Sequence, residues 1–208
     1  MSLEFVLATH NAKKVREFQR IIGERMPQAA VLAYDGPEPV EEGVTFEENA
    51  LIKARTAAAH TGRIALADDS GIVVDVLGAA PGILSSRWAG QDASDEANVQ
   101  LLLDQLSDIR RPHRGAEFRC TIALVVPDAV IRGGHEFVAE GRWRGNLAYE
   151  PRGSHGFGYD PIFEPDGREI TSAELTPDEK NALSHRARAF EALLPELERL
   201  ATRIGDDG

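Results

Sequence analysis

The stretch ALADDSGIVVDVLG, residues 65–78, decides the fold because its apolar residues suit a strand at the centre of a sheet. It also carries two adjacent acids, Asp68 and Asp69. Its pattern predicts two strand segments over 64–77, broken at Asp68-Asp69-Ser70-Gly71. Because neighbouring side chains of a strand point to opposite faces, only one aspartate can enter a given site. Two interpretations stay open, namely a simple turn, or a carboxylate that binds Mg²⁺ or acts as a general base.

Outward from this stretch, helical and strand patterns follow one another along the whole chain. We expect strands over 4–9, 117–126 and 136–143, and helices over 13–22, from Thr45 to about His60, from Ser94 to about Leu106, after Thr176-Pro177, and through the tail that holds Leu193 and Ile204. With no repeat or linker, these elements predict one domain over residues 1–208. Its fold class is α/β or α+β, built on one mixed sheet.

Composition narrows the function classes. The chain has 208 residues, is 42% hydrophobic and 27% charged, and carries a formal net charge of −11. That charge argues against a nucleic-acid partner but not against a small anionic ligand. No apolar run approaches the roughly 20 residues of a membrane span. The lone Cys120 and the absence of a signal-like start favour the cytoplasm.

Candidate phosphate and metal ligands gather in the first third of the chain. The junction Ala8-Thr9-His10-Asn11-Ala12-Lys13-Lys14 joins a strand to a helix start, which is either a phosphate seat or an ordinary Asn-capped helix. A second acidic cluster, Glu41-Glu42, together with the aspartates, suits Mg²⁺. Lys53 is either a phosphate contact or a solubilising surface lysine.

Candidate base-binding residues lie near the other end. The Gly-rich loop 153–161 holds Phe157 and Asp160, and is either a seat for a flat ligand or a tight turn around a core Phe. Lys180 and His185 would lie about 140° apart on one continuous helix. Since Ser184 is a good N-cap, we expect a helix break before it.

The order of these motifs resembles the inosine triphosphate pyrophosphatase family. The motifs are Thr-x-Asn-x-x-Lys (9–14), Thr-Phe-x-x-Asn-Ala-x-x-Lys-Ala (45–54), Ala-Asp-Asp-Ser-Gly (67–71), Gly-Ala-Ala-Pro-Gly-Ile (78–83), Gly-Phe-Gly-Tyr-Asp-Pro-Ile-Phe (156–163), and Ala-Glu-Leu-Thr to Ser-His-Arg (173–186). The resemblance implies a long mixed central sheet flanked by helices, two lobes around a substrate cleft, and a homodimer. It also implies Mg²⁺-dependent cleavage of ITP, dITP and XTP to a nucleoside monophosphate and pyrophosphate.

The resemblance also assigns roles. Asp69 is the expected catalytic base, and Glu41 and Asp69 are the expected metal ligands. The expected substrate-binding residues are Thr9, His10, Asn11, Ala12, Lys13, Lys14, Lys53, Ser70, Phe157, Gly158, Tyr159, Asp160, Lys180, His185 and Arg186. Phe157 would stack on the purine, while the last four would read its edge.

The chain departs from the motifs at a few positions. It has His10 and Lys13 where the family has glycine, and Glu41-Glu42-Gly43 where Glu-Thr-Gly is usual; His155 is also unusual. Donors to the oxo group of hypoxanthine would be left unpaired by adenine, so we expect strong discrimination against ATP and weaker discrimination against GTP. Three alternatives stay open, namely a pyrophosphatase for pyrimidine or modified nucleotides, a nucleotide sensor without catalysis, and a nucleic-acid-binding module.

Overall fold

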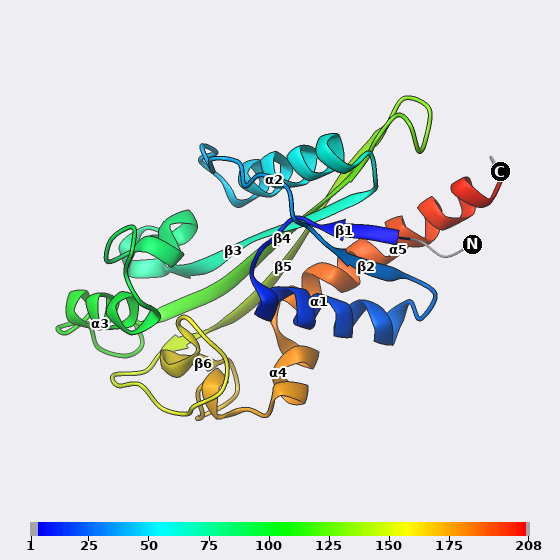
Figure 1. The fold of residues 1–208 in the computed structure, drawn as a ribbon. Helices are drawn as coiled ribbons and strands as arrows, with labels where there is room; N and C mark the ends of the chain where they lie inside the picture. Colours follow the sequence, from blue (N-terminus) through cyan, green and yellow to red (C-terminus); the bar gives the residue numbers. More distant parts are fainter. Residues whose placement is uncertain (1–3, 207–208) are drawn as a thin grey trace. The chain divides into compact units, whose positions relative to one another are not determined.

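A six-stranded mixed sheet organises the protein, whose computed structural model describes residues 4–206 (Figure 1). The strand order is β2-β1-β3-β4-β5-β6. β1 pairs in parallel with β2 and with β3, whereas β5 and β6 are antiparallel. The strands are β1 (Glu4–Leu7), β2 (Ala30–Ala33), β3 (Ala65–Val74), β4 (Gly115–Val126), β5 (His135–Leu147) and β6 (Phe163–Pro165). The expected mixed sheet flanked by helices is confirmed.

The predicted break at residues 68–71 is wrong, because β3 runs without interruption from Ala65 to Val74. Asp68 and Asp69 are buried within the strand, and the next residues Ile72, Val73 and Val74 are buried too. Gly71 lets the strand pass close to its neighbours, since a Cβ there would lie 2.5 Å from the Gly82 carbonyl oxygen. The Asp-Asp-Ser-Gly sequence therefore makes no turn.

The helices are α1 (Ala12–Arg25), α2 (Phe46–Thr61), α3 (Asp95–Gln105), α4 (Pro177–Leu183) and α5 (His185–Asp206). The Thr45, Ser94 and Thr176 side chains each accept a backbone N–H at the start of α2, α3 and α4, so these predicted caps are confirmed. The predicted end at Gly23 is wrong, because α1 continues through it to Arg25. The short edge strand β2 was not predicted; its four residues carry little pattern.

Ser184 separates the last two helices, as predicted. Its backbone is extended, and its N–H donates to the Lys180 carbonyl at 2.9 Å. α4 therefore ends at Leu183 and α5 begins at His185. Because of this break, Lys180 and His185 do not share one continuous helix.

The described chain forms two compact units. The first holds residues 4–69, 121–141 and 187–206, and the second holds residues 70–120 and 142–186. Small side chains dominate one core of the first unit, where Ala50, Ala54, Ala57 and Ala58 of α2 pack with Val6. Larger side chains fill the second unit's core: Ile72, Val74, Val99, Leu102, Leu106, Phe118, Trp143, Leu147, Tyr159, Ile162, Phe163 and Leu175. Alanines let α2 approach the sheet closely, which brings the residues on that helix near β3.

No helix within residues 4–206 is both long enough and apolar enough to cross a bilayer.

Candidate functional site

Asp68 and Asp69 are each buried against a different lysine. Being consecutive on an extended strand, they point to opposite faces, as expected. Asp68 is 3% exposed and pairs through Oδ2 with Lys14 Nζ at 3.0 Å, whereas Asp69 is 8% exposed and pairs through Oδ1 with Lys53 Nζ at 3.0 Å. Each buried carboxylate is thus matched by one ammonium group, which offsets the cost of burial.

Lys53 on α2 joins Asp69 to the acidic loop. Its Nζ lies 3.0 Å from Glu41 Oε1 and 3.0 Å from Asp69 Oδ1. Asn49, one helical turn earlier, donates to Asp69 Oδ2 at 3.4 Å and accepts the Gly43 N–H at 2.9 Å. One face of α2 therefore holds both the strand carboxylate and the loop that carries Glu41.

The charges of this cluster perturb one another. Burial raises the pKa of Asp69, Lys53 opposes that effect, and the negative charge of Glu41 raises the pKa further. Burial disfavours the charged form of Lys53, but the charge of Asp69, with those of Asp68 and Glu41, outweighs it and raises the pKa of Lys53. The lysine is therefore held as a cation among three carboxylates.

The carboxylate oxygens of Glu41 and Asp69 are of the type that a hard divalent cation binds. Lys53 lies between Glu41 and Asp69 as the cation that the two carboxylates share. Carboxylate oxygens, with waters and substrate phosphates, are the ligands that Mg²⁺ prefers. Among residues 4–206, no group of three or more His, Cys, Asp or Glu side chains is arranged to hold a metal ion by itself. The adjacent Glu42 is exposed, and Glu41 is the acid of this loop that Lys53 contacts.

In the junction between β1 and α1, side chains of the junction itself accept the backbone N–H groups. Thr9 Oγ1 accepts the Asn11 N–H at 3.1 Å, and Asn11 Oδ1 accepts the Lys14 N–H at 3.4 Å. His10 pairs with Glu38 Oε1 at 3.0 Å, and its ring stacks on that of Tyr34. Ala12 is the first residue of α1. The side chain of Lys13 lies outside the described part of the structure. The capped-helix geometry is thus present here.

The Gly-rich loop of the second unit arranges an aromatic ring and two cations. Phe157 is half-buried, and its ring centroid lies 5.2 Å from Lys180 Nζ and 5.2 Å from the guanidinium carbon of Arg186. Asp160 pairs with Lys180 and accepts the Phe157 N–H at 2.8 Å. Arg186 also donates to Ser70 Oγ at 3.2 Å. These predicted residues are brought together.

The remaining predicted residues of this unit support the loop. The ring of His185 is buried and stacks on Phe118, with centroids 4.8 Å apart. The Gly158 N–H donates to Asp95 Oδ2 at 2.8 Å. Tyr159 is buried in the core and its hydroxyl donates to the Ser85 carbonyl at 2.8 Å. His185 and Tyr159 thus pack against the core of this unit.

Sequence reasoning missed Ser172 and Asp95, and it included Asn49 in the motif over 45–54 without giving it a role. Ser172 is 0% exposed and donates to Asp160 Oδ1 at 2.8 Å. A signal for it was present, because Thr171 and Glu174 form a capping box around it. Asp95 carries no local signal, since its partner Gly158 is distant in sequence.

Known proteins resemble this chain over most of its length. The model of the Ham1 family matches residues 5–196. A dITP/XTP pyrophosphatase of Leifsonia xyli subsp. xyli is 58% identical, over 94% of this chain and 96% of the relative. A HAM1 protein from Coxiella burnetii has a TM-score of 0.84 and 43% identity, covering 95% of this chain and 99% of that structure. A dITP/XTP pyrophosphatase from Mycobacterium abscessus has a TM-score of 0.74 and 48% identity, covering 93% and 100%. By sequence and by fold, this chain belongs to the Ham1 family.

Proposed function

We propose that this protein is a nucleoside triphosphate pyrophosphatase that hydrolyses non-canonical purine nucleotides such as dITP, ITP and XTP, and so clears them from the nucleotide pool. Relatives of the same family and near-equal length carry the name dITP/XTP pyrophosphatase. The observation that carries the proposal is the partly buried cluster of Asp69, Lys53 and Glu41, which combines carboxylates with a held cation. Such a cluster suits phosphate chemistry, where catalysis is mainly positioning and charge stabilisation.

We propose Mg²⁺ as the cofactor, with Glu41 and Asp69 as its protein ligands. Bound there, the ion would neutralise negative charge on the phosphates and so favour attack at phosphorus. Lys53 is held as a cation beside both carboxylates and is the natural contact for a phosphate oxygen. Thr9, Asn11 and Lys14 are the further phosphate contacts in this proposal.

Asp69 is the proposed general base. Its pKa is raised by burial, which brings a carboxylate nearer to the range in which it accepts a proton from water. The water oxygen bonds to the α-phosphorus, its proton passes to Asp69, and the bond from the α-phosphorus to the bridging oxygen breaks. A nucleoside monophosphate and pyrophosphate result.

The second unit is the proposed base site. Phe157 offers a half-buried ring for stacking, and Lys180 and Arg186 beside it are cationic donors suited to the purine oxo group. Adenine carries an amino group at that position and would leave these donors unpaired. The proposal therefore includes selection against ATP.

The test is pyrophosphate release with Mg²⁺ from dITP, XTP, GTP, ATP and a pyrimidine triphosphate. We expect turnover of dITP and XTP, and a loss of at least about 100-fold in Asp69→Asn because the base is removed. Asp92→Asn, at an exposed loop position, is the charge-matched control. Equal turnover of ATP and dITP would contradict the base site. Binding of dITP without turnover would favour a sensor, and preference for the pyrimidine would favour the related pyrophosphatase.

We also propose that the protein acts in the cytoplasm, which the lone Cys120 favours, and as a homodimer, which rests on the family resemblance. Sedimentation equilibrium across a tenfold concentration range tests the dimer.

A further inference from the structure

Asp160 is buried with protein donors on both carboxylate oxygens. It is 2% exposed. Oδ1 accepts the Ser172 hydroxyl at 2.8 Å, and Oδ2 accepts the Phe157 N–H at 2.8 Å and pairs with Lys180. A carboxylate has about four acceptor sites, so three of them are directed at the protein. Its strongest partner is the ammonium group of Lys180.

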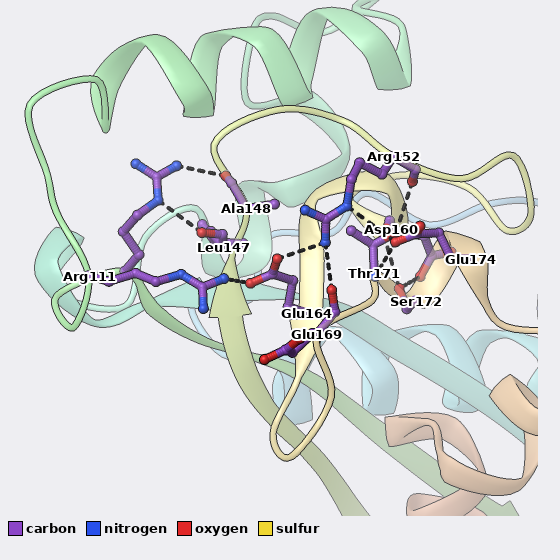
Figure 2. A network of polar contacts seen from close by, with 11 residues as sticks. Arg111, Leu147, Ala148, Arg152, Asp160, Glu164, Glu169, Thr171, Ser172 and Glu174 are labelled. Atoms are coloured by element: carbon purple, nitrogen blue, oxygen red, sulfur yellow. Dashed lines mark hydrogen bonds and ion pairs between the residues drawn. The ribbon is translucent and has the colours of Figure 1, made fainter.

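Ser172 is held in place by the turn around it. The Thr171 N–H donates to Glu174 Oε2 at 2.7 Å, and the Thr171 hydroxyl donates to the Arg152 carbonyl at 2.8 Å. Arg152 in turn donates to Glu164 Oε1 at 2.8 Å. Figure 2 shows these contacts around Thr171 and Arg152, together with the contact of the neighbouring Ser172 with Asp160. The serine hydroxyl is therefore aimed at Asp160 by groups outside the loop.

The loop packs closely around Asp160 and Lys180. Gly156 has a φ of +81°, and a Cβ there would lie 2.1 Å from Asp160 Oδ2 and 3.0 Å from Lys180 Nζ. The glycine backbone thus packs directly on the two charged groups. Any shift of the Asp160 carboxylate would move Lys180 relative to the Phe157 ring.

We propose that Asp160 and Ser172 are positioning residues that hold Lys180 beside Phe157, and that Asp160 acts through Lys180 rather than on the purine itself. The inference deepens the proposed function and rests on it. It assigns the selectivity of the base site to a cation whose place is set by a buried carboxylate and a buried hydroxyl. Ser172 is not among the residues that the family resemblance assigns to substrate binding.

A double-mutant cycle on Asp160 and Lys180 tests the proposal. Lys180→Met removes a charged donor and should raise the KM for dITP about 10- to 100-fold. Asp160→Asn should raise KM by a similar factor, while kcat stays within about threefold because the phosphate cluster lies in the other unit. In the Lys180→Met background, Asp160→Asn should raise KM no further, because contacting residues are not additive when one acts through the other.

Ser172→Ala keeps the test decisive where Asp160→Asn folds poorly. Loss of one neutral hydrogen bond should raise KM for dITP about 3- to 10-fold, and this effect should vanish in the Lys180→Met background. Asp108→Asn and Ser107→Ala, two exposed neighbours in the turn after α3, are the matched controls and should leave KM unchanged.

A nucleotide-free measurement separates the two proposals. The chain has four lysines, at positions 13, 14, 53 and 180, so ¹⁵N-lysine labelling gives few Nζ signals, and Lys180→Met assigns one of them. Ser172→Ala should shift that signal. The positioning role would be overturned if Asp160→Asn raised KM equally in the wild-type and Lys180→Met backgrounds, or if the Lys180 signal did not move. Turnover by the wild type would still support the proposed function in that case. No turnover and no binding by the wild type would overturn both.

Discussion

Lys53 is the residue on which the cluster of Glu41, Lys53 and Asp69 depends. It pairs with Glu41 and Asp69 at once, and both contacts are partly buried. We predict that Lys53→Met lowers kcat/KM for dITP about 10- to 100-fold, because one charged contact to phosphate is lost and two carboxylates then face each other.

The control for Lys53 lies half a turn along the same helix. Arg55→Met removes an exposed cation that pairs with Glu136, and surface pairs contribute at most about 1 kcal/mol. Pyrophosphate release should be unchanged in this variant. An equal loss in both variants would mean that helix charge in general, and not Lys53, supports activity.

Tyr159 gives a pH prediction. Burial, with the negative charge of Asp95, raises the pKa of its hydroxyl. The folded state therefore holds this proton more tightly than the unfolded state, whose tyrosine titrates near about 10. The contribution to stability is complete below that pH and falls as the pH rises above it.

The measurement for Tyr159 is the urea midpoint at pH 8, 9, 10 and 10.5. Tyr159→Phe should be less stable at pH 8 by about 1 kcal/mol, because the bond to the Ser85 carbonyl is lost. Its decline above pH 9 should be shallower than that of the wild type. Tyr149→Phe, at an exposed position, should decline like the wild type. Parallel curves for the wild type and Tyr159→Phe would refute the assignment.

At the scale of the element, two glycines predict opposite effects of one substitution. Gly71 lies in β3, where a Cβ would meet the Ser85 hydroxyl at 2.4 Å and the Gly82 carbonyl oxygen at 2.5 Å. Gly23 lies inside α1 with nothing within 4 Å of its Cβ position. Gly71→Ala should destabilise by about 1–3 kcal/mol, and Gly23→Ala should stabilise by about 0.5–1 kcal/mol.

Thermal unfolding of the two alanine variants beside the wild type decides this point. Opposite shifts in melting temperature would confirm that β3 is closely packed at Gly71 and that α1 continues through Gly23. A stabilised Gly71→Ala would mean that the strand is less closely packed there.

At the scale of the whole molecule, the strands β3, β4 and β5 each have residues in both compact units. Since neighbouring strands share hydrogen bonds along their length, we predict one cooperative unfolding transition. Arg114 tests it from the second unit. It is buried and donates to the Leu106, Leu147 and Ala148 carbonyls at 2.7–2.9 Å.

Arg114→Met should lower the free energy of unfolding by about 3 kcal/mol or more, because buried carbonyls lose their donor. Arg110→Met, at an exposed position, should change it by less than about 0.5 kcal/mol. Calorimetry should show a single shifted peak for Arg114→Met. Two separated peaks would contradict the single transition.

Local patterns in the sequence determined the helix caps, the break at Ser184 and the order of the motifs, because each depends on residues a few positions apart. The order of the motifs also pointed to the family, to which the chain belongs. Local reasoning failed at residues 68–71, where a turn-like sequence is a buried strand, because neighbouring strands and lysines distant in sequence satisfy it.

Tertiary structure alone decided which charged groups meet. Lys14 selects Asp68, Lys53 joins Asp69 to Glu41, and Ser172 holds Asp160. These partners are 12 or more residues apart, so no periodicity relates them. A buried charge or hydroxyl needs a partner wherever the fold brings one, and the sequence by itself contains the groups but not their pairing.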